Sequence, residues 1–505
     1  MLLGVGAFVL RRYSTLPSLA GRVASRAVND AGNTQLGRAI HPFVEAHPNF
    51  SGIYPLRAAR DAFAARVHLA RVAQRTLDVQ YYIWEKDLTG TLLLQELRKA
   101  ADRDVRVRLL LDDNNTSGLD VILAALDSHP NIEVRLFNPF VIRYPRIGYL
   151  TDFLRANRRM HNKSFTADNQ ATIIGGRNVG DEYFGATEGM LFVDLDVLAI
   201  GPVVSEVSND FDRYWNSASA YPVDRILPRV NSQKLLELSA DANRIEQSTQ
   251  AIAYMKALRE SPFVEQLVGG KLELQWAATK IISDDPAKGL GRAAREKLFP
   301  QQLKDVVGEP AMNLDLVSAY FVPSAAGARS LISFTKRGAT IRVLTNSFEA
   351  TDVPAVHAGY MKRRKGLLKA GIRLYELRRA SSAPRDGKTT GIGGSSGSSL
   401  HAKTFSVDGS RVFIGSFNFD PRSAKLNTEL GFVIDSTALA RQVEQTFDTR
   451  VPKDAYEVRL SDTGQLYWIE QREGRLVRYD TEPGTTFWTR AFLWFLSRLP
   501  IESLL

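Results

Sequence analysis

The chain has 505 residues, which is too long for one compact core and predicts at least two domains. Its 65 Lys and Arg exceed its 55 Asp and Glu, and the net charge of +10 favours anionic partners such as nucleic acid or an anionic membrane surface. The absence of cysteine excludes disulfides, thiolate metal sites and a cysteine nucleophile.

The N-terminal segment, residues 1–54, begins with ten apolar residues followed by Arg11 and Arg12. Ten residues are too few to span a bilayer, which needs about 20. A signal peptide would place its basic residues before the apolar run rather than after it. We therefore expect this segment either to touch a membrane or to fray.

The same order of elements occurs twice along the chain. In the first half, residues 77–83 and 105–113 predict strands on either side of a helical pattern at 92–104. In the second half, residues 316–322 and 340–347 predict strands that likewise flank a helix. Repeated strand–helix–strand units predict an α/β fold with two domains, each a mixed sheet flanked by helices.

The composition also predicts where the domains divide. We expect the first domain at residues 55–230, the second at 231–450 and a C-terminal extension at 451–505. A linker is expected near residues 215–260, where turn-forming residues gather. Residues 381–399 are rich in Gly and Ser, which predicts a mobile lid or a loop that faces phosphate.

One histidine motif stands in each half. The first copy, HNKSFTADNQATIIGG, begins at His161, and the second, HAKTFSVDGSRVFIGS, begins at His401. Each copy places a Lys, an Asp, a small residue and an Asn at the same distances after the histidine. The matching positions, each pair 240 residues apart, are His161 and His401, Lys163 and Lys403, Asp168 and Asp408, Gly176 and Ser416, and Asn178 and Asn418.

Each motif predicts a β-hairpin that gathers hydrogen-bond donors around an imidazole. Alternation along the strand places His and Lys on one face, and a turn at ADNQ or VDGS returns the small residue and the Asn toward the His. Such a cluster suits a tetrahedral anion such as a phosphoryl group. The motif acids Asp168 and Asp408 are counted with the catalytic motif, but their place in a turn favours a structural anchor.

A single His-x-Lys pair is most often incidental, whereas two matching copies favour a functional site. A metal site is not expected, because Lys is a poor ligand and the spacing matches no common metal motif.

The doubled motif resembles the signature of the phospholipase D superfamily, H-x-K-x4-D followed by G-[GS]-x-N, which Gly175 and Gly415 complete. Segments such as LLLDDNNTSGLD and NTELGFVIDS are similar to bacterial cardiolipin synthases, most of all the C type. The resemblance covers roughly residues 55–450. It implies two halves that are related by a pseudo-twofold axis and share one active site.

The resemblance also implies how the site works. One histidine attacks phosphorus to form a phosphohistidine, and the other protonates the leaving alcohol and then deprotonates the incoming one. We assign His161 as the nucleophile and His401 as the general acid and base, although the symmetry permits the reverse. Neither a metal nor a cofactor is required. The groups expected to bind the phosphate oxygens are Lys163, Lys403, Asn178, Asn418, Gly176 and Ser416.

Two acids are expected to orient the histidines, because a reactive imidazole usually has its other nitrogen held by a carboxylate. Asp194 follows His161 by 33 residues, and Glu429 follows His401 by 28. Both acids begin apolar strands, where a carboxylate needs a partner, and the family places an orienting acid at these positions. Asp196 shares a face with Asp194 and is a second choice.

The C-terminal segment, residues 486–505, mixes five aromatic residues with Arg490 and Arg498. Aromatic residues interleaved with Arg are typical of a helix that lies in a bilayer interface. The alternative is a terminal helix docked on the protein's own core. Before this segment, a hairpin is expected to turn near Glu473 and Gly474.

The resemblance predicts a phosphatidyltransferase that makes cardiolipin from phospholipids. Two alternatives use the same residues: a phospholipase D that hydrolyses phospholipids to phosphatidic acid, and a nucleic-acid phosphodiesterase. The expected partners are phosphatidylglycerol, phosphatidylethanolamine, an anionic membrane surface and an accessory protein. Nucleic acid is disfavoured, because an interfacial tail would then be superfluous. The expected location is the bacterial inner membrane, with peripheral or monotopic attachment.

Overall fold

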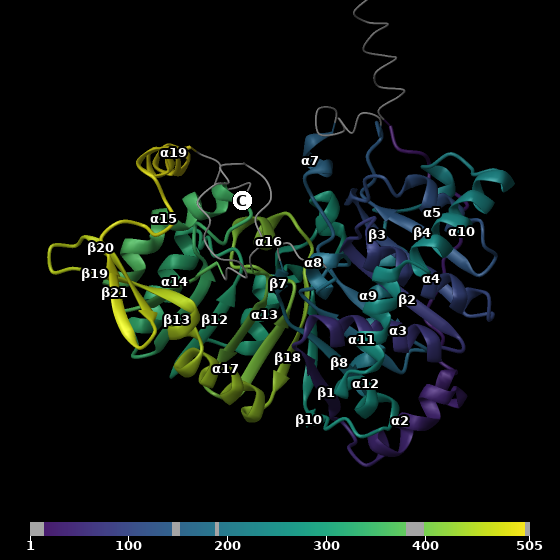
Figure 1. The fold of residues 1–505 in the computed structure, drawn as a ribbon, viewed down its shortest axis with the longest axis horizontal. Coiled ribbons are helices and arrows are strands. Elements are labelled where there is room, and N and C mark those ends of the chain that lie inside the picture. The colour runs from purple at the N-terminus through teal and green to yellow at the C-terminus, as the bar shows by residue number, and fades with distance from the viewer. Residues whose placement is uncertain (1–14, 144–151, 187–190, 380–397, 500–505) are drawn as a thin grey trace, which may run out of the picture.

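The computed structural model describes residues 15–143, 152–186, 191–379 and 398–499. Within these residues the chain forms two large mixed β-sheets, each flanked by helices, that stand side by side (Figure 1). The strand order is β10-β1-β8-β6-β5-β2-β3-β4-β9 in the first sheet and β11-β18-β17-β16-β12-β13-β14-β19-β20-β21 in the second. The predicted fold class, two α/β domains, is confirmed.

The first sheet comes mainly from the first half of the chain. Its strands are β1 (Ser51–Leu56), β2 (Thr76–Ile83), β3 (Arg106–Asn115), β4 (Ile132–Phe137), β5 (Ser164–Ala167), β6 (Ala171–Gly175), β8 (Asp196–Ile200), β9 (Ala220–Pro222) and β10 (Gln275–Ala277). The helices of this half are α2 (Gln35–Glu45), α3 (Ala59–Val72), α4 (Leu88–Ala101), α5 (Asp120–Asp127), α7 (Phe153–Ala156), α8 (Asp181–Phe184), α9 (Pro202–Trp215), α10 (Ser232–Glu246), α11 (Thr249–Arg259) and α12 (Pro262–Val268).

The second sheet has the same order of strands and carries three further strands, β19 to β21, at one edge. Its strands are β11 (Thr279–Ser283), β12 (Asn313–Ser318), β13 (Thr340–Asn346), β14 (Arg373–Leu377), β16 (Lys403–Val407), β17 (Arg411–Gly415), β18 (Leu430–Asp435), β19 (Ala455–Leu460), β20 (Leu466–Arg472) and β21 (Arg475–Tyr479). Its helices are α13 (Phe299–Val307), α14 (Ala325–Lys336), α15 (Pro354–Lys369), α16 (Pro421–Lys425), α17 (Thr437–Thr449), α18 (Val451–Asp454) and α19 (Phe487–Arg498). Two short strands, β7 (Leu191–Val193) and β15 (Ser398–Leu400), pair with each other outside both sheets.

The sequence repeat is also a structural repeat. The order β8-β6-β5-β2-β3-β4 in the first sheet matches β18-β17-β16-β12-β13-β14 in the second. In each half three parallel strands run beside an antiparallel hairpin that carries the histidine motif. The carboxyl ends of parallel strands meet at one edge of a sheet, so each half delivers its strand-end side chains to that edge.

The two halves share a buried core where β6 and β8 meet β17 and β18. Ile174 and Val197 from the first half pack in one cluster with Ile414 and Phe432 from the second. Burial of apolar side chains from both halves stabilises their relative position.

The chain passes from the first sheet to the second after residue 230, where we expected the boundary between the two domains. The stretch 215–260, where a linker was expected, folds mainly as α10 and α11, and Ala251, Tyr254 and Leu258 are buried in the first core. Strand β10 then pairs with β1, and the chain enters the second sheet at β11. The first half therefore extends through β10, since β10 belongs to the first sheet and the apolar side chains of α11 are buried in the first core.

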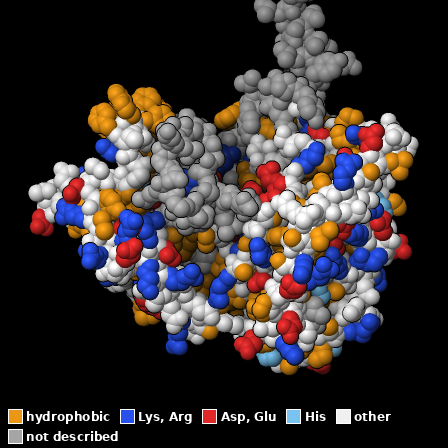
Figure 2. Space-filling model, in the orientation of Figure 1, with side chains coloured by type: hydrophobic (Ala, Val, Ile, Leu, Met, Phe, Trp, Pro, Cys, Tyr) orange, Lys and Arg blue, Asp and Glu red, His pale blue; other side chains and the backbone are white. Residues whose placement is uncertain are grey.

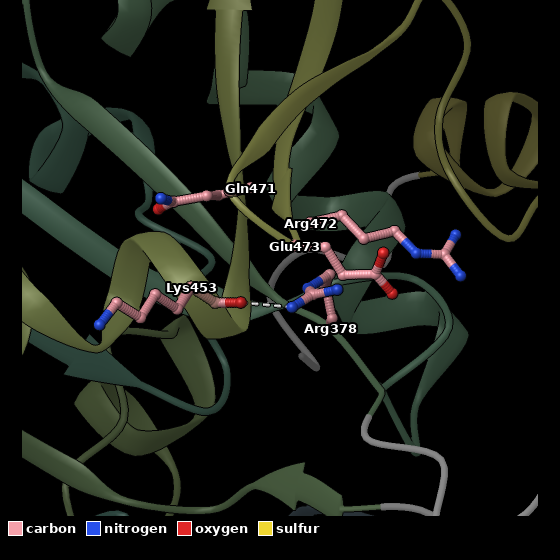
Figure 3. Close-up of a pocket in the computed structure, with 6 residues that line it drawn as sticks. Arg378, Lys453, Gln471, Arg472 and Glu473 are labelled. Atoms are coloured by element: carbon pink, nitrogen blue, oxygen red, sulfur yellow. Dashed lines mark hydrogen bonds between the residues drawn. The ribbon is translucent and has the colours of Figure 1, made fainter.

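Strands β19, β20 and β21 extend the second sheet beyond the repeat. The hairpin between β20 and β21 turns at Glu473 and Gly474, as the sequence predicts. Between this hairpin and α18 lies a surface pocket of about 490 Å³, shown in Figure 3. There Arg378 donates a hydrogen bond to the main-chain oxygen of Lys453. The described residues that line this pocket include neither motif histidine.

Two expectations lie outside the described residues: the apolar start at residues 1–10 and most of the Gly- and Ser-rich stretch at 381–399. From residue 15 onward the N-terminal segment lies against the first half, where Arg22 donates to the main-chain oxygen of Asn216. Within the four described ranges, no helix combines the length and the hydropathy needed to cross a membrane.

Candidate active site

The turn of each motif hairpin anchors the hairpin to its sheet. The first turn residue, Asp168 or Asp408, has a positive φ of 53° or 52°, as type I′ hairpin turns require. The Asp168 carboxylate accepts from the N–H groups of residues 74–76, and that of Asp408 from residues 311–313. Burial opposes the charge of Asp408, but these N–H groups outweigh burial and lower its pKa. Both acids lie at the turn end of their hairpins, about 20 Å from the motif histidines along extended strands.

At the other end of the hairpins, each motif histidine is joined through its backbone to the opposite half. The N–H of His161 donates to the main-chain oxygen of Thr428 at 2.9 Å. The N–H of His401 donates to that of Val193 at 2.8 Å, where β15 runs parallel to β7. Thr428 and Val193 each directly precede one of the two predicted orienting acids. The backbone pairing therefore carries the acid of one half to the histidine of the other.

The side chains complete this crossed arrangement. Nδ1 of His161 lies 2.8 Å from Oε2 of Glu429, and Nδ1 of His401 lies 2.5 Å from Oδ2 of Asp194. Both carboxylates are fully buried. Because Nδ1 of each ring is held by a carboxylate, Nε2 is the nitrogen that can attack phosphorus or transfer a proton.

Two buried lysines lie beside the histidines. Nζ of Lys163 donates to the main-chain oxygen of His161 at 2.6 Å, and Nζ of Lys403 lies 3.0 Å from Nδ1 of His401. Burial lowers the pKa of both lysines, and the charge of Lys403 lowers the pKa of Lys163 further. A bound anion would stabilise both ammonium groups, so the arrangement favours an anionic ligand.

The two histidine–acid pairs are alike in geometry but not in charge. Burial, together with the charges of the nearby lysines, lowers the pKa of His161 well below its ordinary value and that of His401 to about 4. Burial opposes the ionisation of Asp194, but the charges of His401 and Lys403 outweigh it and hold the pKa low. Burial raises the pKa of Glu429 to about 7. Asp194 therefore keeps its negative charge, whereas Glu429 takes up a proton near neutral pH.

The small residues of the motif contact the orienting acids in two different ways. The hydroxyl of Ser416 donates to Oε2 of Glu429 and accepts from the N–H of Leu430. At the equivalent position, a Cβ on Gly176 would lie only 2.2 Å from Oδ1 of Asp194. Ser416 and Gly176 were both predicted to bind phosphate, and the structure places both against an orienting acid. A hydroxyl thus supports one acid, and the lack of a side chain makes room for the other.

Two tyrosines that the sequence analysis did not single out stand edge-on to the histidines. The ring of Tyr82 lies 4.9 Å from that of His161, and the ring of Tyr183 lies 5.3 Å from that of His401. Sequence reasoning could have found Tyr82, because it is the second-last residue of the strand predicted at 77–83, at the edge where parallel strands deliver site residues. Tyr183 gave no such signal, since it lies in the short helix α8.

The two motif asparagines are buried after their hairpins. The side-chain oxygen of Asn178 accepts from the N–H of Ile83 at 3.3 Å, next to Tyr82. The side-chain oxygen of Asn418 is buried with no donor among the residues that the structure describes. Asn178 is thus placed beside Tyr82, the ring that stands edge-on to His161.

Two other acids near the site have structural partners. Asp196, the second choice for an orienting acid, forms a buried ion pair with Arg66 at 2.7 Å. Asp112, at the end of β3, accepts from the N–H of Met160 at 2.7 Å and so positions the residue before His161. In the described part of the chain, no group of three or more His, Asp or Glu side chains is close enough to hold a metal ion.

Comparison with known proteins agrees with this geometry. A family model described as "Cardiolipin synthase, PLD-like domain" matches residues 67–215 and 304–451, so that each matched region contains one histidine motif. The chain also has the fold of a solved phosphatidylserine synthase from Haemophilus influenzae Rd KW20, with a TM-score of 0.57, 15% identity, and coverage of 94% of this chain and 100% of that one. The chain therefore belongs to the PLD-like cardiolipin synthase family, as the doubled motif and the segments similar to cardiolipin synthases predict.

Within that family, the chain is a homologue of cardiolipin synthase C from Escherichia coli K12. The two are 50% identical over 474 residues, which cover 93% of this chain and 100% of that protein. An uncharacterised protein from Helicobacter pylori strain 26695 is 31% identical over 94% of each chain. The resemblance to the C type is confirmed.

Proposed function

We propose that this protein makes cardiolipin by moving a phosphatidyl group from one phospholipid to a hydroxyl of another. The observation that supports this most is the pair of crossed histidine–carboxylate contacts beside two buried lysines. The family match and the 50% identity to cardiolipin synthase C support the same reaction.

In the first step, Nε2 of His161 attacks the phosphorus of the donor lipid. The bond from phosphorus to the headgroup oxygen breaks, and that oxygen takes a proton from Nε2 of His401. The products are a phosphatidyl-histidine and a free headgroup alcohol, which is glycerol from phosphatidylglycerol or ethanolamine from phosphatidylethanolamine. Lys163, Lys403 and the two motif asparagines would bind the phosphoryl oxygens.

In the second step, His401 acts as the base. It takes a proton from a hydroxyl of the acceptor phosphatidylglycerol, whose oxygen attacks the phosphorus. The bond from phosphorus to Nε2 breaks, and its electron pair returns to His161. Cardiolipin leaves, and both imidazoles regain their starting states.

The charges of the two acids favour this division of roles. Burial and the nearby lysines hold the pKa of His401 at about 4 in the free site, and the negative charges of Asp194 and of a bound phosphoryl group would together stabilise the imidazolium that the acid–base role needs. The pKa of Glu429 is raised to about 7, which suits a neutral His161 whose Nε2 lone pair can attack.

Peripheral attachment to the bacterial inner membrane through α19 fits this reaction. Leu493 of α19 is buried and docks the helix on the second half, as expected for a terminal helix packed on the protein's own core. Most of the other large side chains of α19 are exposed (Figure 2), as expected for a helix that lies in a bilayer interface. The exposed aromatic residues are Phe487, Trp488, Phe492, Trp494 and Phe495. Such residues partition into the bilayer interface.

Mass spectrometry of lipids tests the reaction, after incubation of the protein with vesicles of phosphatidylglycerol and phosphatidylethanolamine. Cardiolipin should form with the intact protein and not with the His161→Ala or His401→Ala variants. The released alcohol would identify the donor lipid. Phosphatidic acid as the sole product would favour the hydrolase instead. No change in any lipid would require an accessory protein or another substrate, and addition of a cell extract separates these two cases.

A further inference from the structure

The loop between β13 and α15 carries an acid, Asp352, to the side of the candidate active site where His401 lies. The loop begins after Asn346, which ends β13 and holds the residue before His401. The side-chain nitrogen of Asn346 donates to the main-chain oxygen of Leu400, and its side-chain oxygen accepts from the N–H of Leu400, at 2.9 Å each. The loop that carries Asp352 therefore leaves the sheet next to the second histidine.

Tyr320 fixes the position of the Asp352 carboxylate. The hydroxyl of Tyr320 donates to Oδ2 of Asp352 at 2.7 Å. The N–H of Ala319, the residue before Tyr320, donates to the main-chain oxygen of Ala402 at 3.3 Å. Ala402 stands between the histidine and the lysine of the second motif. Two contacts thus connect Asp352 to the second motif itself.

The charge of Asp352 acts on both halves of the site. Burial lowers the pKa of Lys403, and the negative charge of Asp352 opposes this shift. In the first half, burial raises the pKa of Tyr183, and the charge of Asp352 raises it further. The ring of Tyr183 lies edge-on to that of His401 at 5.3 Å. Asp352 is therefore close to the groups that surround the second histidine.

The carboxylate of Asp352 is open to a ligand. Its side chain is exposed, and within the four described ranges no Lys, Arg or His side chain forms an ion pair with it. A carboxylate repels the oxygens of a phosphoryl group, so Asp352 is unsuited to bind the phosphate itself. It accepts hydrogen bonds from hydroxyl groups and, more strongly, from ammonium groups. The ligand group that suits it is therefore a hydrogen-bond donor next to the phosphate.

The first half has a glycine at the matching position. Asp112 and Asn346 occupy equivalent strand ends, since each contacts the residue before the histidine of its own half. Six residues after Asp112 stands Gly118, and six residues after Asn346 stands Asp352. The acid thus breaks the symmetry of the repeat on the side of His401.

From these contacts we propose that Asp352 selects the alcohol that leaves or enters at His401. Its carboxylate accepts a hydrogen bond from a hydroxyl or ammonium group on the carbon next to the one that carries the reacting oxygen. Glycerol and ethanolamine both have such a donor, whereas a simple alcohol has none. This inference rests on the proposed function, in which His401 protonates the leaving alcohol and deprotonates the acceptor.

Competition between alcohols tests this selection. The donor is a short-chain phosphatidyl-p-nitrophenol, whose leaving group needs no proton and has no adjacent hydrogen-bond donor. One pair of acceptors is 1,2-propanediol and 1,3-propanediol, which differ only in the position of one hydroxyl. The other pair is ethanolamine and its uncharged isostere 1-propanol. Mass spectrometry gives the product ratio within each pair, and the wild type should favour 1,2-propanediol and ethanolamine about tenfold, as expected for a hydrogen bond to a charged group.

Replacing Asp352 should remove these preferences. Asp352→Ala should bring both product ratios close to one, and unchanged ratios would overturn the proposal. Asp352→Asn should lower the ethanolamine ratio more than the diol ratio, because the amide keeps an acceptor oxygen but loses the charge. An equal loss in both ratios would contradict a contact with the ammonium group. The control Asp462→Ala removes an exposed acid in the turn between β19 and β20 and should keep the wild-type ratios.

A further variant separates the acid from the tyrosine that holds it. Tyr320→Phe keeps the carboxylate and should retain most of both preferences. A loss as large as that in Asp352→Ala would assign the preference to the tyrosine instead. Because each ratio is measured within one sample, a partial loss of folded protein does not change it.

The same proteins distinguish this inference from the proposed transferase. Transfer to every alcohol without preference in the wild type would leave the transferase standing and overturn the selection by Asp352. If the wild type forms only phosphatidic acid with every alcohol, the transferase is wrong, and the selection is measured on the donor. Hydrolysis of phosphatidylglycerol and phosphatidylethanolamine should then fall in Asp352→Ala relative to that of phosphatidyl-1-propanol. Equal falls for all three lipids would overturn the selection.

Discussion

The imidazole of His161 is held by Glu429, a residue 268 positions later in the chain, through a contact of 2.8 Å between Nδ1 and Oε2. The reciprocal contact joins His401 to Asp194, 207 positions earlier. Neither half of the repeat can complete a histidine–acid pair from its own residues. The site exists only where the two halves meet, so their docking is a condition for chemistry.

Replacing Glu429 by Gln should lower kcat by about 10²- to 10⁴-fold, because the amide cannot hold the His161 imidazole in the tautomer that attacks phosphorus. The rate of cardiolipin formation measures this effect. The matched control is Glu473→Gln in the β20–β21 turn, which should behave as wild type. A Glu429→Gln rate within threefold of wild type would contradict the orienting role.

The two histidines should fail in different ways when each is replaced by Ala. With His401→Ala, a substrate whose leaving alcohol needs no protonation should still form the phosphohistidine, which then accumulates because the acceptor is not deprotonated. With His161→Ala, no such adduct should form. Mass spectrometry of the intact protein after rapid mixing detects the adduct. An adduct in the His161→Ala variant would reverse the two assigned roles.

Gly176→Ala should impair activity at least tenfold, because its Cβ would lie 2.2 Å from Oδ1 of Asp194 and would displace the partner of His401. The matched control is Gly327→Ala, where the nearest atom would be at an ordinary 3.6 Å. Turnover and thermal unfolding of both variants separate a local effect from a loss of folding. Equal turnover in the two variants would show that the position of Asp194 does not matter.

The raised pKa of Glu429 predicts a pH-dependent stability. In the native state this pKa is about 7, above the 4.5 of the free side chain. Between these two pH values the native state binds more protons than the unfolded state. Protonation of Glu429 therefore adds its full contribution to the free energy of unfolding below about pH 4.5, and this contribution is lost as pH rises through about 7. As pH rises through this window, the free energy of unfolding of the wild type should fall by up to about 3 kcal/mol relative to that of Glu429→Gln. Denaturant midpoints of both proteins in steps from about pH 5 to pH 8 test this, and a constant difference would contradict it.

Asp168→Ala should reduce stability rather than chemistry. Its carboxylate is buried and accepts from three backbone N–H groups, so its loss should cost about 3 kcal/mol. The kcat of the folded enzyme, measured well below the unfolding temperature, should stay within about threefold of wild type. The control is Asp462→Ala in an exposed turn. A large drop in kcat without a loss of stability would return Asp168 to the catalytic group.

Much of the fold and of the site could be predicted from local pattern. The repeat was visible because strand and helix periodicities recur in the same order, and the motif residues keep one offset of 240. Asp194 and Glu429 stood out because a carboxylate at the start of an apolar strand needs a partner. The turn positions of Asp168 and Asp408 indicated their anchoring role, which their hydrogen bonds to backbone N–H groups fit.

Only the tertiary structure shows which acid contacts which histidine and how far the first half extends. The sequence identified both acids but left open which histidine each one contacts, and the structure pairs each acid with the histidine of the opposite half. Residues beyond 230 also join the first half, because α11 buries its apolar side chains in the first core and β10 pairs in the first sheet. Crossed contacts depend on which backbone edges meet, at Thr428 and at Val193, when the halves dock. That docking is determined by apolar surfaces contributed from distant segments, and no short stretch of sequence carries this information.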